Sequence, residues 1–203
     1  MKTEVLKNFI VLEGLDGAGT TTQLNSLTAK LIEDNLTVFK TFEPTDQNIG
    51  RLIRSVLQKK ISLEAKTISK LFVADRYEHI YGKDGIIEHL DNGEYVICDR
   101  YLFSSLAYQS PDCDFDFVYN INKDYPLPEY LFFISTPVEV CQERLDKRGD
   151  EKELFDAKEF QKQVVSFYNK ALEIYKDSGI NIQIIDGNKS PNDITNEILN
   201  IIR

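Results

Sequence analysis

The chain has 203 residues, of which 42% are apolar, so it is long enough for one domain with a substantial core and too apolar to be disordered. It contains 24 lysines and arginines and 33 aspartates and glutamates. The resulting net charge of −9 argues against nonspecific binding to nucleic acid or to an anionic membrane. No apolar run approaches the roughly 20 residues that span a bilayer, and residues 1–7 are too mixed for a secretory signal, so we expect neither nucleic acid nor membrane as a partner.

Five short segments predict strands, and those at 9–13 and 95–98 are apolar enough to predict buried ones. In chain order these are residues 9–13, 37–42, 95–98, 130–134 and 182–185. Apolar residues at helical spacing occupy the segments between and after them. These predicted helices are residues 21–35, 49–57, 62–90, 137–148, 157–178 and 191–202.

The predicted helix over 62–90 and the segment 111–128 depart from this regular alternation. We expect the helix over 62–90 to begin with Ser62 as its N-cap and to be interrupted near Gly82 and Gly85. Residues 111–128 are polar, aromatic and weakly patterned, which predicts a surface loop with room for a short helix.

Strands that alternate with helices predict an α/β fold, in which a parallel sheet lies between layers of helices. We find no repeat, low-complexity tract or linker, so residues 1–203 are expected to form a single domain. Ligands of such sheets bind beyond the carboxyl ends of the strands. The segments that carry candidate binding or catalytic residues, at 16–22, 43–44 and 99–100, follow predicted strands.

Residues 14–22, Gly-Leu-Asp-Gly-Ala-Gly-Thr-Thr-Thr, join the first strand to the first helix. This is the context of the phosphate loop G-x-x-x-x-G-K-[ST], in which backbone N–H groups surround a phosphate at a helix N-terminus. Thr21 stands where a hydroxyl ligates Mg²⁺, but Thr20 stands where the pattern has lysine. The alternatives to a working phosphate loop are a structural turn and a loop that binds phosphate but has lost catalysis. The expected ATP ligands here are Gly14, Gly17, Ala18, Gly19, Thr20, Thr21 and Thr22.

Two motifs further along the chain complete a family pattern. Residues 71–76 read LFVADR and residues 99–109 read DRYLFSSLAYQ. Together with EGLDGAG at 13–19 and Glu43-Pro44, they closely resemble the thymidylate kinase family of P-loop nucleoside monophosphate kinases. The resemblance runs from about Phe9 to the last helix and implies a three-layer α/β/α sandwich around a five-stranded parallel sheet.

Phe72 and Arg76 are one helical turn apart and therefore share a face of the predicted helix. An aromatic ring can stack on a base while a guanidinium donates to a carbonyl such as thymine O4. The pair predicts a pyrimidine pocket. The alternative for Phe72 is a core aromatic.

The resemblance assigns further residues to the acceptor nucleotide. It places Arg100 and Arg54 on the monophosphate; the alternatives are a surface ion pair of Arg100 with Asp99 and a solvated helix face for Arg54. The other substrate residues that it implies are Glu43 and Pro44, Ser104 and Ser105 at the thymine ring, Tyr108 beneath the sugar, and Gln109.

The resemblance also implies the catalytic groups. It places Asp16 near the 3′-hydroxyl and the transferring phosphate, and Asp99 near the magnesium. A lid is expected at about 144–155, where Arg144 and Arg148 match the family's R-x-x-x-R and Lys152 stands where arginine is more usual. We expect Arg144 to bind ATP and Arg148 or Lys152 to close over the γ-phosphate; the alternative is a solvated loop.

The implied reaction is transfer of the γ-phosphoryl group of ATP to dTMP with Mg²⁺, by a homodimer that pairs through the helix from Ser62. The alternatives are a kinase for another pyrimidine monophosphate such as dUMP, and a catalytically weakened nucleotide-binding protein. Three scattered cysteines, Cys98, Cys113 and Cys141, fit reduced thiols in the cytoplasm better than a disulfide framework. His79 and His89 lack metal-ligand spacing and are expected to be structural.

Overall fold

A computed structural model describes residues 4–149, 154–155 and 157–203. Five strands form one parallel sheet in the order β2-β3-β1-β4-β5, as the alternation of strands and helices predicts. The strands are β1 (Val5–Gly14), β2 (Val38–Phe42), β3 (Tyr95–Asp99), β4 (Leu127–Ser135) and β5 (Asn181–Asp186). The helices are α1 (Thr20–Glu33), α2 (Asn48–Leu57), α3 (Ala65–Tyr81), α4 (Ile86–Asp91), α5 (Leu102–Tyr108), α6 (Phe115–Asn122), α7 (Val138–Arg148), α8 (Lys158–Tyr175) and α9 (Pro191–Ile202).

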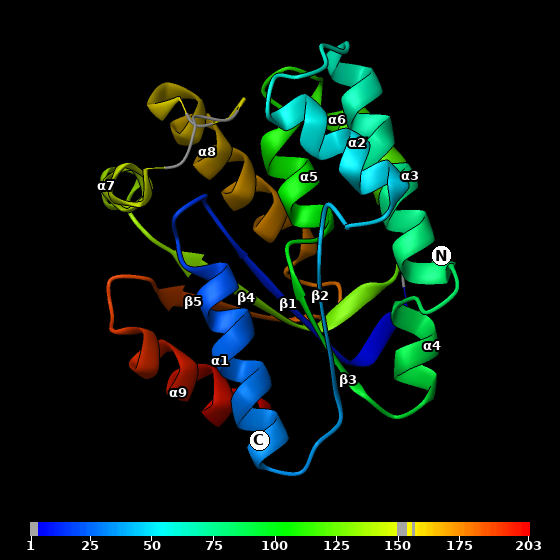
Figure 1. The fold of residues 1–203 in the computed structure, drawn as a ribbon, viewed down its shortest axis with the longest axis vertical. Coiled ribbons are helices and arrows are strands. Elements are labelled where there is room, and N and C mark those ends of the chain that lie inside the picture. The colour runs from blue at the N-terminus through cyan, green and yellow to red at the C-terminus, as the bar shows by residue number, and fades with distance from the viewer. Residues whose placement is uncertain (1–3, 150–153, 156) are drawn as a thin grey trace.

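Helices cover both faces of the sheet, which explains why β1 is apolar without alternation. Ile10 and Leu12 pack against α1 and α9, which lie side by side on one face (Figure 1). Phe9 and Val11 point to the opposite face, where they join a larger core with α4, α5 and α8. The molecule is therefore the three-layer α/β/α sandwich expected from the sequence.

The predicted helix over 62–90 is two helices, α3 and α4, and it breaks at the two glycines as expected. A side chain on Gly85 would approach the Gly82 carbonyl oxygen to 2.7 Å, so the turn between the helices requires this glycine. The prediction of Ser62 as N-cap is wrong. Glu64 precedes the first helical residue, and Ser62 lies too far upstream to accept an N–H of the first turn.

The short helix for which the prediction left room at 111–128 is present as α6. The prediction of a surface loop is wrong, because the segment also contains the start of β4, and Phe115 and Val118 are buried against the core. Asp114 caps α6 by accepting the backbone N–H groups of Asp116 and Phe117. The aromatic residues that weakened the sequence pattern are the ones that pack.

Two further expectations concern the whole chain. The cysteines Cys98, Cys113 and Cys141 are buried and unpaired, as expected. Within the described ranges, no helix combines the length and the apolar character needed to cross a bilayer.

Candidate functional site

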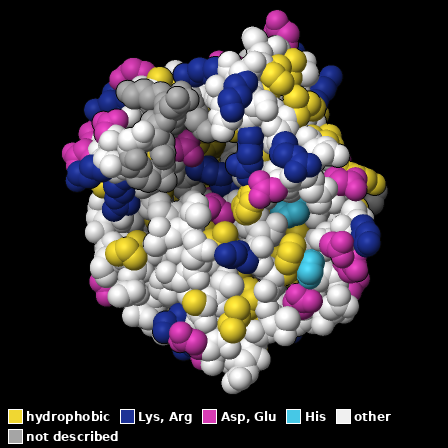
Figure 2. Space-filling model, viewed as in Figure 1, with side chains coloured by type: hydrophobic (Ala, Val, Ile, Leu, Met, Phe, Trp, Pro, Cys, Tyr) yellow, Lys and Arg dark blue, Asp and Glu magenta, His cyan; other side chains and the backbone are white. Residues whose placement is uncertain are grey.

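Two adjoining cavities open beyond the carboxyl ends of β1, β2 and β3. One has a volume of about 570 Å³ and the other about 610 Å³. Asp16, Thr21 and Arg100 line both. Figure 2 shows lysine and arginine side chains gathered around this hollow, although the chain carries a net negative charge.

The first cavity collects every residue that the sequence assigns to the acceptor nucleotide. These are Glu43, Pro44, Arg54, Phe72, Arg76, Arg100, Ser104, Ser105, Tyr108 and Gln109. The second cavity collects the phosphate-loop residues 17–22 and Arg144, and it adds Lys147 and Lys189. Gly14 does not line either cavity. A side chain there would lie 3.0 Å from both Ala18 Cβ and the Ile134 carbonyl oxygen, so Gly14 lets the loop pack on β4.

Glycine conformation and packing on α7 set the shape of the phosphate loop. Gly17 and Gly19 have φ values of 87° and 104°, in the left-handed region that side chains disfavour. A Cβ on Gly17 would also lie 2.6 Å from the carbonyl oxygen of Cys141. Arg144 donates to the Gly17, Ala18 and Gly187 carbonyl oxygens at 3.3, 3.2 and 3.0 Å. It thus ties α7 and the β5–α9 connection to the loop.

The predicted metal residues lie together. Thr21 Oγ1 donates to Asp99 Oδ2 at 2.6 Å, while the buried Asp99 Oδ1 has no partner within the described part of the chain. A hydroxyl and a carboxylate are the oxygen ligands that Mg²⁺ prefers, and this ion takes one or two carboxylates together with phosphates and water. The donor set therefore fits Mg²⁺ bound with a nucleotide. The described residues contain no group of three or more acidic, histidine or cysteine side chains that would make a cage.

Arg100 does not pair with Asp99, so that alternative is wrong. Its Nη2 forms an ion pair with Asp16 Oδ1 at 2.5 Å, and its Nη1 donates to the Gly14 carbonyl and to Ser104 Oγ. The guanidinium also lies 5.1 Å from the centre of the Tyr108 ring. Burial acts against its charge, but Tyr108 and Asp16 outweigh this effect, so the pKa of Arg100 lies well above its ordinary value.

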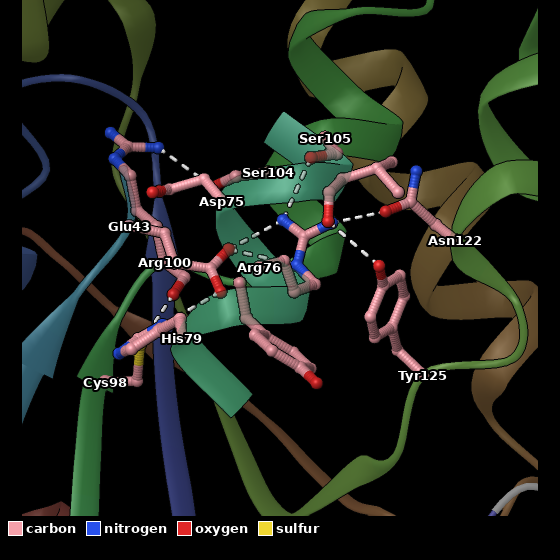
Figure 3. A network of polar contacts seen from close by, with 12 residues as sticks. Glu43, Asp75, Arg76, His79, Cys98, Arg100, Ser104, Ser105, Asn122 and Tyr125 are labelled. Carbon is pink, nitrogen blue, oxygen red and sulfur yellow. Dashed lines mark hydrogen bonds and ion pairs between the residues drawn. The ribbon is translucent and has the colours of Figure 1, made fainter. Parts of the chain in front are cut away.

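Arg76 is 1% exposed and forms the centre of the buried network in Figure 3. Its Nε and Nη2 donate to Glu43 Oε2 at 3.0 and 2.7 Å, Nη2 donates to Ser105 Oγ at 3.0 Å, and Nη1 donates to Asn122 Oδ1. These contacts use four of the five guanidinium N–H groups. One Nη1 N–H is left without an acceptor in the described part of the protein. Burial acts to raise the pKa of Glu43, but Arg76 holds it below its ordinary value.

Two buried residues, Asp75 and His79, lie near the first cavity without lining it, and Asp75 was not predicted from the sequence. Asp75 accepts the Thr45 backbone N–H and hydroxyl at 2.7 Å each, which fixes the turn after β2 to α3. His79 contacts Glu43 Oε1 at 3.1 Å and Thr41 Oγ1 at 2.6 Å, which fits the structural role expected for it. The signal for Asp75 was present, because it precedes Arg76 in the LFVADR motif.

Two fully buried residues, Glu13 and Tyr168, were also missed. Burial raises the pKa of Glu13 to about 7, although the Ser104 hydroxyl, Arg100 and the Tyr168 hydroxyl act to lower it. Tyr168 lies in the middle of α8, where the sequence shows only an apolar helical pattern.

Arg54 donates to the Pro44 carbonyl oxygen, lies 5.2 Å from the centre of the Phe42 ring and lines the first cavity. Arg148 ends α7, but its side chain lies outside the described part of the protein, and so does Lys152 of the predicted lid.

Comparison with known proteins identifies the relatives of the chain. The family model described as Thymidylate kinase matches residues 12–198. A Treponema pallidum protein provisionally named a thymidylate kinase is 46% identical over 164 residues, which cover 81% of this chain and 78% of that protein. The thymidylate kinase of Leptospira borgpetersenii is 35% identical over 198 residues, covering 95% and 92%. The solved structure of thymidylate kinase from Candida albicans superposes with a TM-score of 0.79 at 25% identity, over all of this chain and 92% of that one.

Proposed function

The chain belongs to the thymidylate kinase family, and from that premise we propose how its residues transfer the γ-phosphoryl group of ATP to dTMP, giving ADP and dTDP. The observation that carries the proposal is the pair of cavities that meet at Asp16, Thr21 and Arg100. A donor nucleotide in one cavity and an acceptor monophosphate in the other would bring the reacting phosphates to this meeting point. Phosphoryl transfer needs mostly positioning and charge stabilisation, with little covalent work by the protein.

The second cavity is the ATP side. Backbone N–H groups of residues 17–22 would surround the phosphates, because α1 begins at Thr20 and its first turn has no side-chain cap within the described chain. Thr20 brings no charge, so the positive charge must come from other side chains. Arg148 and Lys152 remain our first choices, and Arg144, Lys147 and Lys189 support the idea because they line the same cavity.

Thr21 and Asp99 would hold Mg²⁺ together with the ATP phosphates. The unpartnered Asp99 Oδ1 supports this assignment. When bound, the ion would neutralise charge that develops on the phosphate oxygens.

The first cavity is the dTMP side. Arg100 would bind the monophosphate, with Arg54 as a second contact, and Asp16 would lie near the 3′-hydroxyl and the transferring phosphate. Phe72 would stack on thymine, and the remaining N–H of Arg76 would donate to O4. The other contacts would come from Glu43, Pro44, Ser104, Ser105, Tyr108 and Gln109.

We also propose that the protein is a cytoplasmic homodimer. The outer face of α3 carries Tyr77 and Tyr81, which are 59% and 47% exposed, and their ring centres lie 4.8 Å apart. Exposed neighbouring aromatics of this kind are typical of an interface. Light scattering would give the mass in solution, and a monomer would rule out the proposed homodimer.

The cytoplasmic location is proposed because the free buried thiols fit a reducing compartment.

A coupled assay of ADP formation tests the proposed reaction. We expect turnover with ATP and dTMP, Mg²⁺ dependence, and slower turnover with dUMP at subsaturating concentration. The thymine methyl is worth only about 1–3 kcal/mol, so dUMP should still react. Binding of dTMP without turnover would instead identify a weakened nucleotide-binding protein.

A further inference from the structure

Glu13 and Tyr168 lie close to Arg100, but neither residue lines either cavity. Both side chains are 0% exposed. Glu13 is near the carboxyl end of β1, and Tyr168 comes from α8, which packs on α5. A buried carboxyl is costly unless other groups hydrogen-bond to it, so its contacts indicate what it holds in place.

The contacts of Glu13 all lead to Arg100 or to its neighbours. Glu13 Oε1 accepts the backbone N–H groups of Tyr101 and Ser104 at 2.8 and 3.1 Å. Glu13 Oε2 accepts the hydroxyls of Ser104 and Tyr168 at 2.6 and 2.8 Å. Arg100 Nη1 in turn donates to Ser104 Oγ at 3.1 Å and to the Tyr168 hydroxyl at 3.4 Å. The Glu13 carboxyl is therefore linked to Arg100 in two ways. It accepts backbone N–H groups of residues that follow Arg100, and it shares the Ser104 and Tyr168 hydroxyls with the Arg100 side chain.

This support matters because Arg100 is held in an uncommon state. Its φ of 73° lies in the left-handed region, which a non-glycine residue occupies only where its surroundings impose it. Asp16 competes for the same guanidinium through Nη2 at 2.5 Å. The two hydroxyls accept from Nη1 together with the Gly14 carbonyl, which lies 3.0 Å from it, so these three acceptors oppose a rotation of the whole group toward Asp16.

We infer that Glu13 and Tyr168 are positioning residues, which act through the Ser104 and Tyr168 hydroxyls to aim Arg100 at the phosphate of the acceptor nucleotide. The inference rests on the proposed role of Arg100 as the monophosphate contact. It assigns neither residue a contact with substrate.

Tyr168→Phe tests the inference because it removes one oxygen and keeps the ring that packs on Tyr108 and Phe133. Tyr175→Phe is the matched control. Tyr175 is also a buried tyrosine of α8, and its hydroxyl has no partner in the described part of the protein. Arg100→Ala provides the reference for losing the phosphate contact itself.

The readout is the dissociation constant of dTMP compared with that of thymidine, measured by calorimetry or by NMR titration. We expect Tyr168→Phe to weaken dTMP about tenfold, because a charge-assisted contact loses its geometry, and to leave thymidine unchanged within about twofold. Tyr175→Phe should alter neither constant. Equal weakening of dTMP and thymidine by Tyr168→Phe, or no weakening of either, would overturn the inference.

A crystal structure of the Tyr168→Phe variant separates this inference from the proposed function. We expect the Arg100 guanidinium to move away from Ser104; an unmoved guanidinium overturns the positioning role whatever the ligand data give. If Arg100→Ala leaves the ratio of the dTMP and thymidine constants unchanged, the phosphate assignment fails instead. A displaced guanidinium would then still support the positioning network.

Discussion

Replacing Glu13 by glutamine should remove a specific pH dependence of stability. Burial raises the pKa of Glu13 from its ordinary value of 4.5 to about 7, so between these pH values the folded chain binds a proton that the unfolded chain has lost. The free energy of unfolding must therefore fall as pH rises through this window, and the contribution is lost above pH 7. Each pKa unit is worth about 1.4 kcal/mol, so the rise from 4.5 to about 7 gives roughly 3.5 kcal/mol in total.

The assay is denaturant unfolding of the parent and Glu13→Gln at several pH values from 5 to 8, without ligand. We expect the stability of the parent relative to the variant to fall by about 2–3 kcal/mol across this range. Glu139→Gln is the control: Lys158 holds the pKa of the exposed Glu139 below its ordinary value, so this carboxylate stays ionised throughout and the difference should be flat. A flat difference for Glu13→Gln would show that Arg100 and the hydrogen bonds outweigh burial, and the reasoning would be wrong.

The remaining predictions concern the base pocket and the phosphate loop. In thermal-shift titrations dTMP should stabilise the protein more than dCMP or AMP, because Arg76 would face the cytosine amino group donor to donor; a larger shift with AMP would rule out the pocket. Glu43→Gln should lower the free energy of unfolding by roughly 3 kcal/mol, because it leaves the charge of Arg76 buried and uncompensated; an unchanged denaturation midpoint would show that water reaches the pair. At least one of Arg148→Ala and Lys152→Ala should lower kcat by a factor of about 100, and less so with Thr20→Lys present. Full kcat in both variants would mean that the missing charge comes from elsewhere.

The layers of the fold could be predicted because short strand-like segments alternate with helical patterns, and because the central strands β1 and β3 carry apolar runs, such as residues 9–12 and 96–98, that burial on both faces explains. Residues 111–128 could not. The two buried positions Phe115 and Val118 are too few to give α6 a periodic signal. Their burial depends on α5, which was not predicted from the sequence, and on α8, which is distant along the chain. Local pattern fails where long-range packing decides the structure.

The site divides in the same way. Residues that line the cavities form dense motifs, so the sequence brings Phe72, Arg76 and Arg100 to notice. Glu13 is the first residue of the EGLDGAG motif but reads as the end of a strand, and Tyr168 reads as one more apolar position of a helix. Their roles depend on a carboxyl of β1, a hydroxyl of α8 and a guanidinium of the β3–α5 connection coming together, which no spacing along the chain encodes.

The effect of Thr20 depends on both the shape and the charge of the phosphate loop. The shape of the phosphate loop depends on the left-handed Gly17 and Gly19 and on the contact of Gly17 with α7, none of which involves the side chain at position 20. Arg144 adds a guanidinium bound to the loop carbonyls from outside the loop. These features do not require a charge at position 20, so we expect threonine in place of lysine to act on the electrostatic field of the loop. Because phosphoryl transfer depends on that field, the cost of the substitution should appear in kcat, and side chains outside the loop are the ones that can offset it.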